Sequence, residues 1–218
     1  MGSHASRIGS SWPLGLTQLR NAGIYRVKLM VEITHQPSYS RVQLLLRMAV
    51  CPIYIMMPHG LMLLPLALVS MVLMPVAWGS ILITGTYPMA LFDFESNLLR
   101  WQMRVNARLL NLADGYPAFG LHAIDVSVQF EIPYPAKLGR MHLVVKLLLG
   151  WAYCGIPHAV VLFIRALLGF VLMVLAFVTV LLAGRYPKVW HSYGVASMLH
   201  LLRVRLYMGG MTDDYPKF

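Results

Sequence analysis

The sequence repeats itself at a shift of 99 residues, and this duplication limits the possible folds more than any other feature. Residues 27–119 align on residues 126–218 without a gap. A register kept over this length does not arise by chance, so the chain is expected to fold as two copies of one unit. The matched residues include Glu32 and Glu131, Arg41 and Arg140, Pro58-His59 and Pro157-His158, Gly85 and Gly184, and Asp114 and Asp213.

The duplication divides the chain into a basic N-terminal extension, residues 1–24, and two repeats, residues 25–119 and 120–218. Each repeat opens with alternating apolar and polar residues, at 26–33 and 125–132. A period of two is typical of a β-strand. The two equivalent strands could pair with each other and form a small two-stranded sheet.

The composition indicates an integral membrane protein. Hydrophobic residues make up 58% of the chain and charged residues 12%, whereas a soluble domain has about a quarter charged residues. Too few polar side chains remain to cover a water-exposed core. A soluble enzyme, a disordered protein and a disulfide-stapled secreted module are therefore all poor interpretations.

Two long apolar regions predict the membrane helices. We expect each repeat to form a transmembrane hairpin, at 42–84 and 141–183, with a turn at Pro-His-Gly (58–60) and at its counterpart 157–159. The second arm of each hairpin is long enough to cross a hydrocarbon core of about 30 Å. The first arm is short and contains Arg47 or Lys146, so it spans only if these side chains snorkel to the headgroups; the alternative is a re-entrant element that crosses half of the membrane. The predicted fold is all-α with four transmembrane helices.

The charge balance agrees with a membrane location. The chain has 18 Lys and Arg against 8 Asp and Glu, a net charge of +10. The basic residues flank apolar runs and form no nucleic-acid motif, so anionic phospholipids are a better partner than nucleic acid. The positive-inside rule then places both termini in the cytoplasm.

Each hairpin is followed by a predicted amphipathic helix, at 90–112 and 189–211. In the first copy, Trp101 and several leucines form one stripe, opposite a polar face. Such a helix suits the membrane interface, and packing against the rest of the protein is the alternative. The basic residues expected to face lipid are Arg100, Arg104, Arg108, Arg203 and Arg205.

His59 and His158 are the candidate cofactor ligands. The duplication places them at equivalent positions beside a helix start, and a pair of histidines on neighbouring helices could ligate haem or another tetrapyrrole. The alternative is that each imidazole caps its helix or bonds a backbone carbonyl at the turn. The other histidines form no metal-binding spacing.

The sequence contains no catalytic motif. It has no carboxylate pair, Ser-His-Asp order or glycine-rich phosphate loop. Asp114 and Asp213 each precede Tyr-Pro, where a carboxylate is expected to bond nearby backbone N–H groups in a turn. The predicted membrane helices lack acidic residues, which argues against proton-coupled or cation-coupled transport.

Several motifs together resemble a known family. They are Val31-Glu-Ile-Thr-His-Gln-Pro-Ser-Tyr-Ser-Arg41, Pro58-His59-Gly60, Gly85-x-Tyr87-Pro88, Leu99-Arg100-Trp101-x-x-Arg104-Val105 and Asp114-x-Tyr116-Pro117. This set resembles the bacterial membrane family catalogued as domain of unknown function 4389, in two tandem copies. The resemblance implies a bacterial inner-membrane protein and assigns no activity, cofactor or catalytic residue. His200 stands in the second copy where the first has Trp101.

The sequence therefore favours a non-enzymatic accessory or scaffold subunit of a larger membrane complex. Its expected partners are other membrane subunits and anionic phospholipids. A pigment-binding or electron-transfer subunit that uses His59 and His158 is one alternative, and a small channel or transporter is another.

Overall fold

The structure is a computed structural model and describes residues 29–218; the predicted N-terminal extension lies outside the described residues. Both repeats contain the same elements in the same order. The first repeat comprises β1 (Met30–Ile33), α2 (Arg41–Cys51), the π-helical turn η1 (Pro52–Met56), α3 (Met57–Thr84) and α4 (Met89–Leu109). The second comprises β2 (Val128–Glu131), α5 (Arg140–Gly150), η2 (Trp151–Gly155), α6 (Ile156–Ala183) and α7 (Lys188–Met208).

The two strands pair as the alternating pattern predicts. They form one antiparallel two-stranded sheet in which Val31 faces Phe130, and these two residues occupy the same position in their repeats. An antiparallel pair centred on equivalent residues is what a two-fold axis through the sheet produces. The register therefore shows that the two repeats are related by a pseudo-two-fold axis at the sheet.

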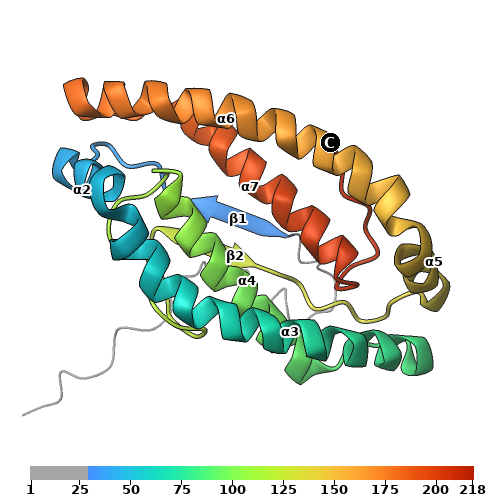
Figure 1. Cartoon of the computed structure of the whole chain (residues 1–218). Helices are drawn as coiled ribbons and strands as arrows, with labels where there is room; N and C mark the ends of the chain where they lie inside the picture. Colours follow the sequence, from blue (N-terminus) through green and yellow to red (C-terminus); the bar gives the residue numbers. More distant parts are fainter. Residues whose placement is uncertain (1–28) are drawn as a thin grey trace, which may run out of the picture.

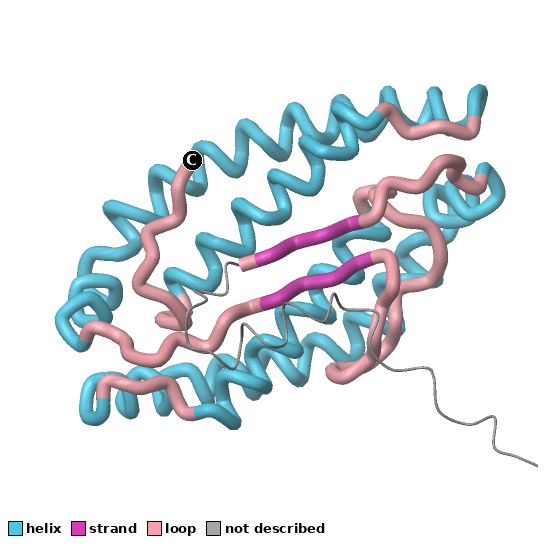
Figure 2. Tube along the Cα trace, turned by 180° about the vertical axis from the view of Figure 1, so that it is seen from behind, coloured by secondary structure: helices cyan, strands magenta, loops and turns pink. Residues whose placement is uncertain are grey.

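The helices form a central pair with one long helix on either side. α3 packs against α4, α6 packs against α7, and α4 and α7 carry the sheet on one face. Figure 1 shows α3 and α6 at opposite edges of the molecule, and Figure 2 shows the two strands lying over the central helices. The main hydrophobic core joins both repeats and includes Ile81, Met103, Leu112, Val180 and Leu202.

The predicted turns at 58–60 and 157–159 are wrong. Pro58 and Pro157 are each the second residue of a long helix, α3 and α6. A proline is tolerated in the first helical turn because its missing N–H has no intrahelical partner there. The π-helical turns η1 and η2 precede these positions, so the backbone continues from one helix into the next.

Each repeat has one long helical run, α2 to α3 in the first and α5 to α6 in the second. The start of each run lies beside the end of the other run. The Tyr39 N–H, just before α2, bonds the Gly184 carbonyl after α6 at 2.9 Å. The Leu138 N–H, just before α5, bonds the Gly85 carbonyl after α3, also at 2.9 Å. The two helical runs are therefore antiparallel, and the four-helix hairpin arrangement is not confirmed. Two helical segments, Ile53–Thr84 and Arg140–Ala183, are long and apolar enough to cross a membrane.

The predicted amphipathic helices correspond to α4 and α7. Both lie between α3 and α6, where α4 buries residues around much of its circumference. This placement agrees with the packing alternative and differs from a helix that lies at the membrane surface. The polar face read from the sequence is covered by other parts of the chain.

Gly85 ends α3 in the left-handed conformation, with a φ of 76°, and its N–H bonds the Ile81 carbonyl. We expect Gly85→Ala to lower the free energy of unfolding by about 1–2 kcal/mol, because a Cβ is disfavoured at positive φ. The added Cβ would lie 3.7 Å from its nearest neighbouring atom, which is an ordinary contact. The expected loss of stability therefore comes from backbone strain and not from a steric clash. Gly79→Ala in the same helix meets no atom within 4 Å and is expected to stabilise the protein. Denaturant unfolding in detergent micelles compares the two, and equal effects would contradict the prediction.

Candidate functional site

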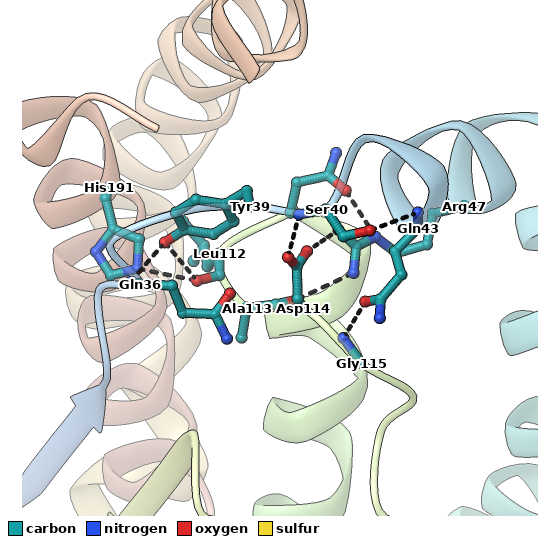
Figure 3. A network of polar contacts seen from close by, with 11 residues as sticks. Gln36, Tyr39, Ser40, Gln43, Arg47, Leu112, Ala113, Asp114, Gly115 and His191 are labelled. Carbon is teal, nitrogen blue, oxygen red and sulfur yellow. Dashed lines mark hydrogen bonds and ion pairs between the residues drawn. The ribbon is translucent and has the colours of Figure 1, made fainter. Parts of the chain in front are cut away.

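A buried ion pair joins the start of each repeat to its end. In the first repeat, an Arg47 nitrogen lies 2.8 Å from Asp114 Oδ1, and Arg47 is 4% exposed. The same guanidinium donates to Asn111 Oδ1 at 3.0 Å and to the Ala113 carbonyl at 3.1 Å. We call the Arg47–Asp114 pair and its counterpart in the second repeat the loop clamps. Figure 3 shows the first of them.

Asp114 also binds the backbone far away in the sequence. Its Oδ2 accepts a hydrogen bond from the Ser40 N–H at 2.6 Å, next to the start of α2 (Figure 3). The sequence predicted a local turn around this aspartate, but the structure shows a tertiary contact. The carboxylate therefore fixes the segment after α4 against the segment before α2.

The second repeat has the same clamp with a lysine. Lys146 Nζ lies 2.7 Å from Asp213 Oδ1 and donates to the Thr212 carbonyl at 2.7 Å. Asp213 Oδ2 accepts the Gly139 N–H at 2.6 Å. Lys146 also lies over the Tyr207 ring, 4.4 Å from its centroid. The expectation that Arg47 and Lys146 snorkel to headgroups is wrong, because both side chains are buried and paired.

Acid is expected to weaken the second clamp. Burial opposes ionisation of Asp213, but the Gly139 N–H and Lys146 outweigh it and hold the pKa of this carboxyl below its usual value. A depressed folded-state pKa contributes stability that is present above the unfolded pKa and is lost as pH falls through the folded value. At pH values below about 4, the denaturant midpoint of unfolding should therefore decrease. The decrease should be smaller in Asp213→Asn. An equal acid loss in both proteins would refute this assignment.

His59 lies in an enclosed aromatic cluster on its own repeat. The imidazole is fully buried, and its Nδ1 accepts a hydrogen bond from Trp101 Nε1 at 2.8 Å. The Tyr116 and Phe119 rings lie 5.1 and 5.0 Å from it between centroids. Because an indole N–H can only donate, the proton of neutral His59 must sit on Nε2. This Nε2 is buried and has no hydrogen-bond partner among the described residues.

His158 has the same position in the second repeat but a different partner. Its Nδ1 lies 3.2 Å from His200 Nε2, and the rings of Tyr215 and Phe218 pack against it. One of these two ring nitrogens donates and the other accepts. The Nε2 of His158, like that of His59, is buried and has no hydrogen-bond partner among the described residues.

The two clusters do not fit a haem. Each imidazole contacts aromatic residues of its own repeat and is 0% exposed, so a tetrapyrrole would have to displace Tyr116 and Phe119 or Tyr215 and Phe218. The described residues also contain no group of three His, Cys, Asp or Glu side chains placed to hold a metal ion. The alternative is not seen either, because no side chain of the described residues caps α3 or α6 and each imidazole bonds a side chain, Trp101 on α4 or His200 on α7.

The basic residues of α4 point mainly into the protein. Arg104 is 3% exposed and donates to the Ala123 carbonyl, and Arg108 is equally buried and pairs with Asp125 at 2.9 Å. Arg100 donates to the Phe130 carbonyl at the sheet. The guanidinium groups bind the segment that links the two repeats. They are therefore not placed to contact lipid headgroups.

The basic residues of α7 lie nearer the surface. Arg203 is half-buried, and Arg205 is exposed and reaches Gln102 on α4. Of the five residues predicted to face lipid, burial excludes Arg104 and Arg108, whereas Arg100 is half-buried like Arg203 and Arg205 is exposed.

A polar joint connects the two repeats beside the first clamp. The Leu112 carbonyl accepts hydrogen bonds from the Tyr39 hydroxyl at 3.5 Å and from His191 Nε2 at 3.0 Å (Figure 3). The His35 ring packs edge-on against His191, with centroids 5.0 Å apart. Burial lowers the pKa of His191 despite its bond to the carbonyl. The joint therefore holds α7 to the first repeat with neutral imidazole.

Sequence reasoning missed one buried acidic residue. Glu95 lies on α4, which the amphipathic pattern placed outside the membrane helices, and its side chain is buried against α3. Glu95 lies beside the apolar stripe of α4. Its burial results from the position of α4 between two other helices, which the sequence pattern did not predict.

Comparison with known proteins gives one match. No curated protein and no solved structure matches the chain. Residues 47–120 match the model of a family described as a domain of unknown function (DUF4389). The matched segment contains Arg47, His59, Trp101 and Asp114, which form the clamp and the histidine cluster of the first repeat. The match supports membership of the DUF4389 family through the first repeat.

Proposed function

We propose that this protein is a non-enzymatic accessory subunit of a larger complex in a bacterial inner membrane. The observation that carries the proposal is the apolar surface of α3 and α6. Only 11% of the residues in the most apolar stretch of each helical segment are buried. An apolar surface of this extent requires lipid or protein to cover it.

The exposed residues follow one side of each helix. In α3 they include Leu61, Leu64, Leu68, Met71 and Val72, and in α6 they include Val160, Phe163, Leu167, Phe170 and Val171. At 100° per residue, each of these two sets lies within an arc of about 100° on the helix circumference. The buried side of each helix packs towards α4 or α7, so the two apolar faces turn away from the centre on opposite flanks (Figure 1).

This geometry supports a subunit that contacts the membrane interior on two flanks. One flank can bind a neighbouring subunit while the other contacts lipid. Exposed basic residues lie beside the ends of the apolar helices, where anionic phospholipid headgroups would meet them. They are Arg41, Arg140, Arg185 and Lys188. Both termini are proposed to face the cytoplasm.

Gentle detergent extraction from native membranes, native-gel sizing and mass spectrometry of the band test this proposal. We expect the protein to migrate in a large complex of fixed stoichiometry. Migration as a monomer or a small homo-oligomer would overturn the accessory role.

Tryptophan substitution distinguishes the two flanks. Met71 and Phe170 are equivalent residues, 74% and 61% exposed. Met71→Trp or Phe170→Trp should release the protein from its complex on the flank that packs against a partner, since an added ring disrupts a close-packed interface. The variant on the lipid flank should stay assembled. If neither variant changes assembly while both fold normally, neither flank is a protein interface.

A further inference from the structure

Glu95 is a buried carboxyl group in the centre of the molecule. The residue is 6% exposed, and its Oε1 has no hydrogen-bond partner among the described residues. Ser70 on α3, the helix that packs against α4, is the polar side chain near the carboxyl. None of the ion pairs formed by the described residues includes Glu95. An ionised carboxylate in this position would be incompletely compensated, which is costly in an apolar interior.

The groups that face Glu95 come from three elements. Ser70 lies on α3, Tyr87 lies in the connection between α3 and α4, and Arg205 lies on α7 of the other repeat. Arg205 and Ser70 both favour the ionised carboxylate. Burial works in the opposite direction and dominates, so the pKa of Glu95 is raised. Burial therefore favours the protonated acid, whereas Ser70 and Arg205 favour the ionised carboxylate.

The second repeat shows that the fold does not need this carboxyl. Glu95 and Ser70 correspond to Gly194 and Gly169. A Cβ at Gly194 would lie 2.7 Å from the Leu112 side chain, so leucine fills the equivalent space. The same helix pair therefore packs with no polar group at that position. The first repeat keeps a carboxyl where an apolar side chain would stabilise the core at lower cost.

We propose that Glu95 is a proton-binding site in the interior of the protein, with the proton as its ligand and with Ser70 and Arg205 controlling its release. Protonation converts the carboxylate to a neutral carboxylic acid, and no other bond changes. The inference does not depend on the accessory role, because it concerns only this site. It also supplies the acidic group that the apolar helices themselves lack.

Labelling with a membrane-permeant hydrophobic carbodiimide tests the site in the full-length protein in native membranes. This reagent adds to protonated carboxyl groups in apolar surroundings, and peptide mass spectrometry locates the adduct. We expect Glu95 to be modified at pH values below its raised pKa, with loss of the adduct as pH rises through that pKa. Glu32 and Glu131 are exposed and serve as internal controls that stay unmodified at neutral pH.

Two variants make the outcome decisive. Arg205→Gln should extend labelling to higher pH, because it removes the charge that favours ionisation. Glu95→Gln should lose the adduct and remain folded, since the amide resembles the protonated acid. A Glu95 that labels no more than Glu32 at any pH, or equally at every pH, would overturn the proposal.

The pH dependence of unfolding gives an independent readout. A raised folded-state pKa contributes stability at low pH that is lost as pH rises through the folded value. The wild-type unfolding midpoint should therefore decline as pH rises above about 4.3, the ordinary glutamate pKa, and Glu95→Gln should lack this decline. Identical pH profiles of the two proteins would also refute the site.

Discussion

Replacing Asp114 with alanine is expected to lower the free energy of unfolding by about 3–5 kcal/mol, because it strands a buried guanidinium without its counter-ion. Arg47 is 4% exposed and lies 2.8 Å from this carboxylate. The substitution also removes the acceptor of the Ser40 N–H, which adds the cost of an unpaired backbone donor. Equilibrium unfolding in detergent micelles measures the loss.

Two matched variants separate the ion pair from simple packing. Arg47→Lys copies the second repeat and should cost far less than Asp114→Ala, since lysine makes the same clamp with Asp213 there. The double variant Arg47→Met with Asp114→Leu replaces both charges by apolar groups and should recover much of the lost stability. If the double variant is as unstable as Asp114→Ala, the stranded charge is not the cause.

The duplication predicted that both copies contain the same elements in the same order, because an ungapped repeat is a long-range constraint. The pairing of the two strands, the long apolar helices and the helices at α4 and α7 all follow from periodicity within each copy. β2 (Val128–Glu131) is shorter than the predicted 125–132, and the first residues of the other predicted strand, 26–28, lie outside the described residues. Local patterns therefore located the elements, and the repeat related them to each other.

The predictions failed where a local pattern has two tertiary outcomes. Pro58 can follow a turn or begin a helix, and the π-helical turn before it lets the helix continue. Arg47 and Arg104 could reach headgroups or bind internal carbonyls and carboxylates, and the partner groups come from distant segments. Glu95 was overlooked for the same reason, since its burial depends on α3. None of these partners is visible from sequence spacing.

Replacing Trp101 with alanine is the second change with a large expected effect, about 3–5 kcal/mol of unfolding free energy. The indole is 3% exposed and packs with Ile55 and Val105 in a small core of its own. Its ring also meets Phe119 edge-on at 5.0 Å. The substitution opens a cavity beside His59 and removes the only donor to the His59 Nδ1 among the described residues.

The hydrogen bond and the packing can be separated within the same pocket. Trp101→Phe keeps most of the ring but leaves the His59 Nδ1 unpaired, which should cost about 1–3 kcal/mol. Trp101→His copies the pair of His158 and His200 and lets His59 donate to a neutral imidazole. It should therefore destabilise less than alanine, although it fills less volume than phenylalanine. If histidine is as damaging as alanine, packing alone holds this cluster, and the hydrogen bond to His59 carries no energetic weight.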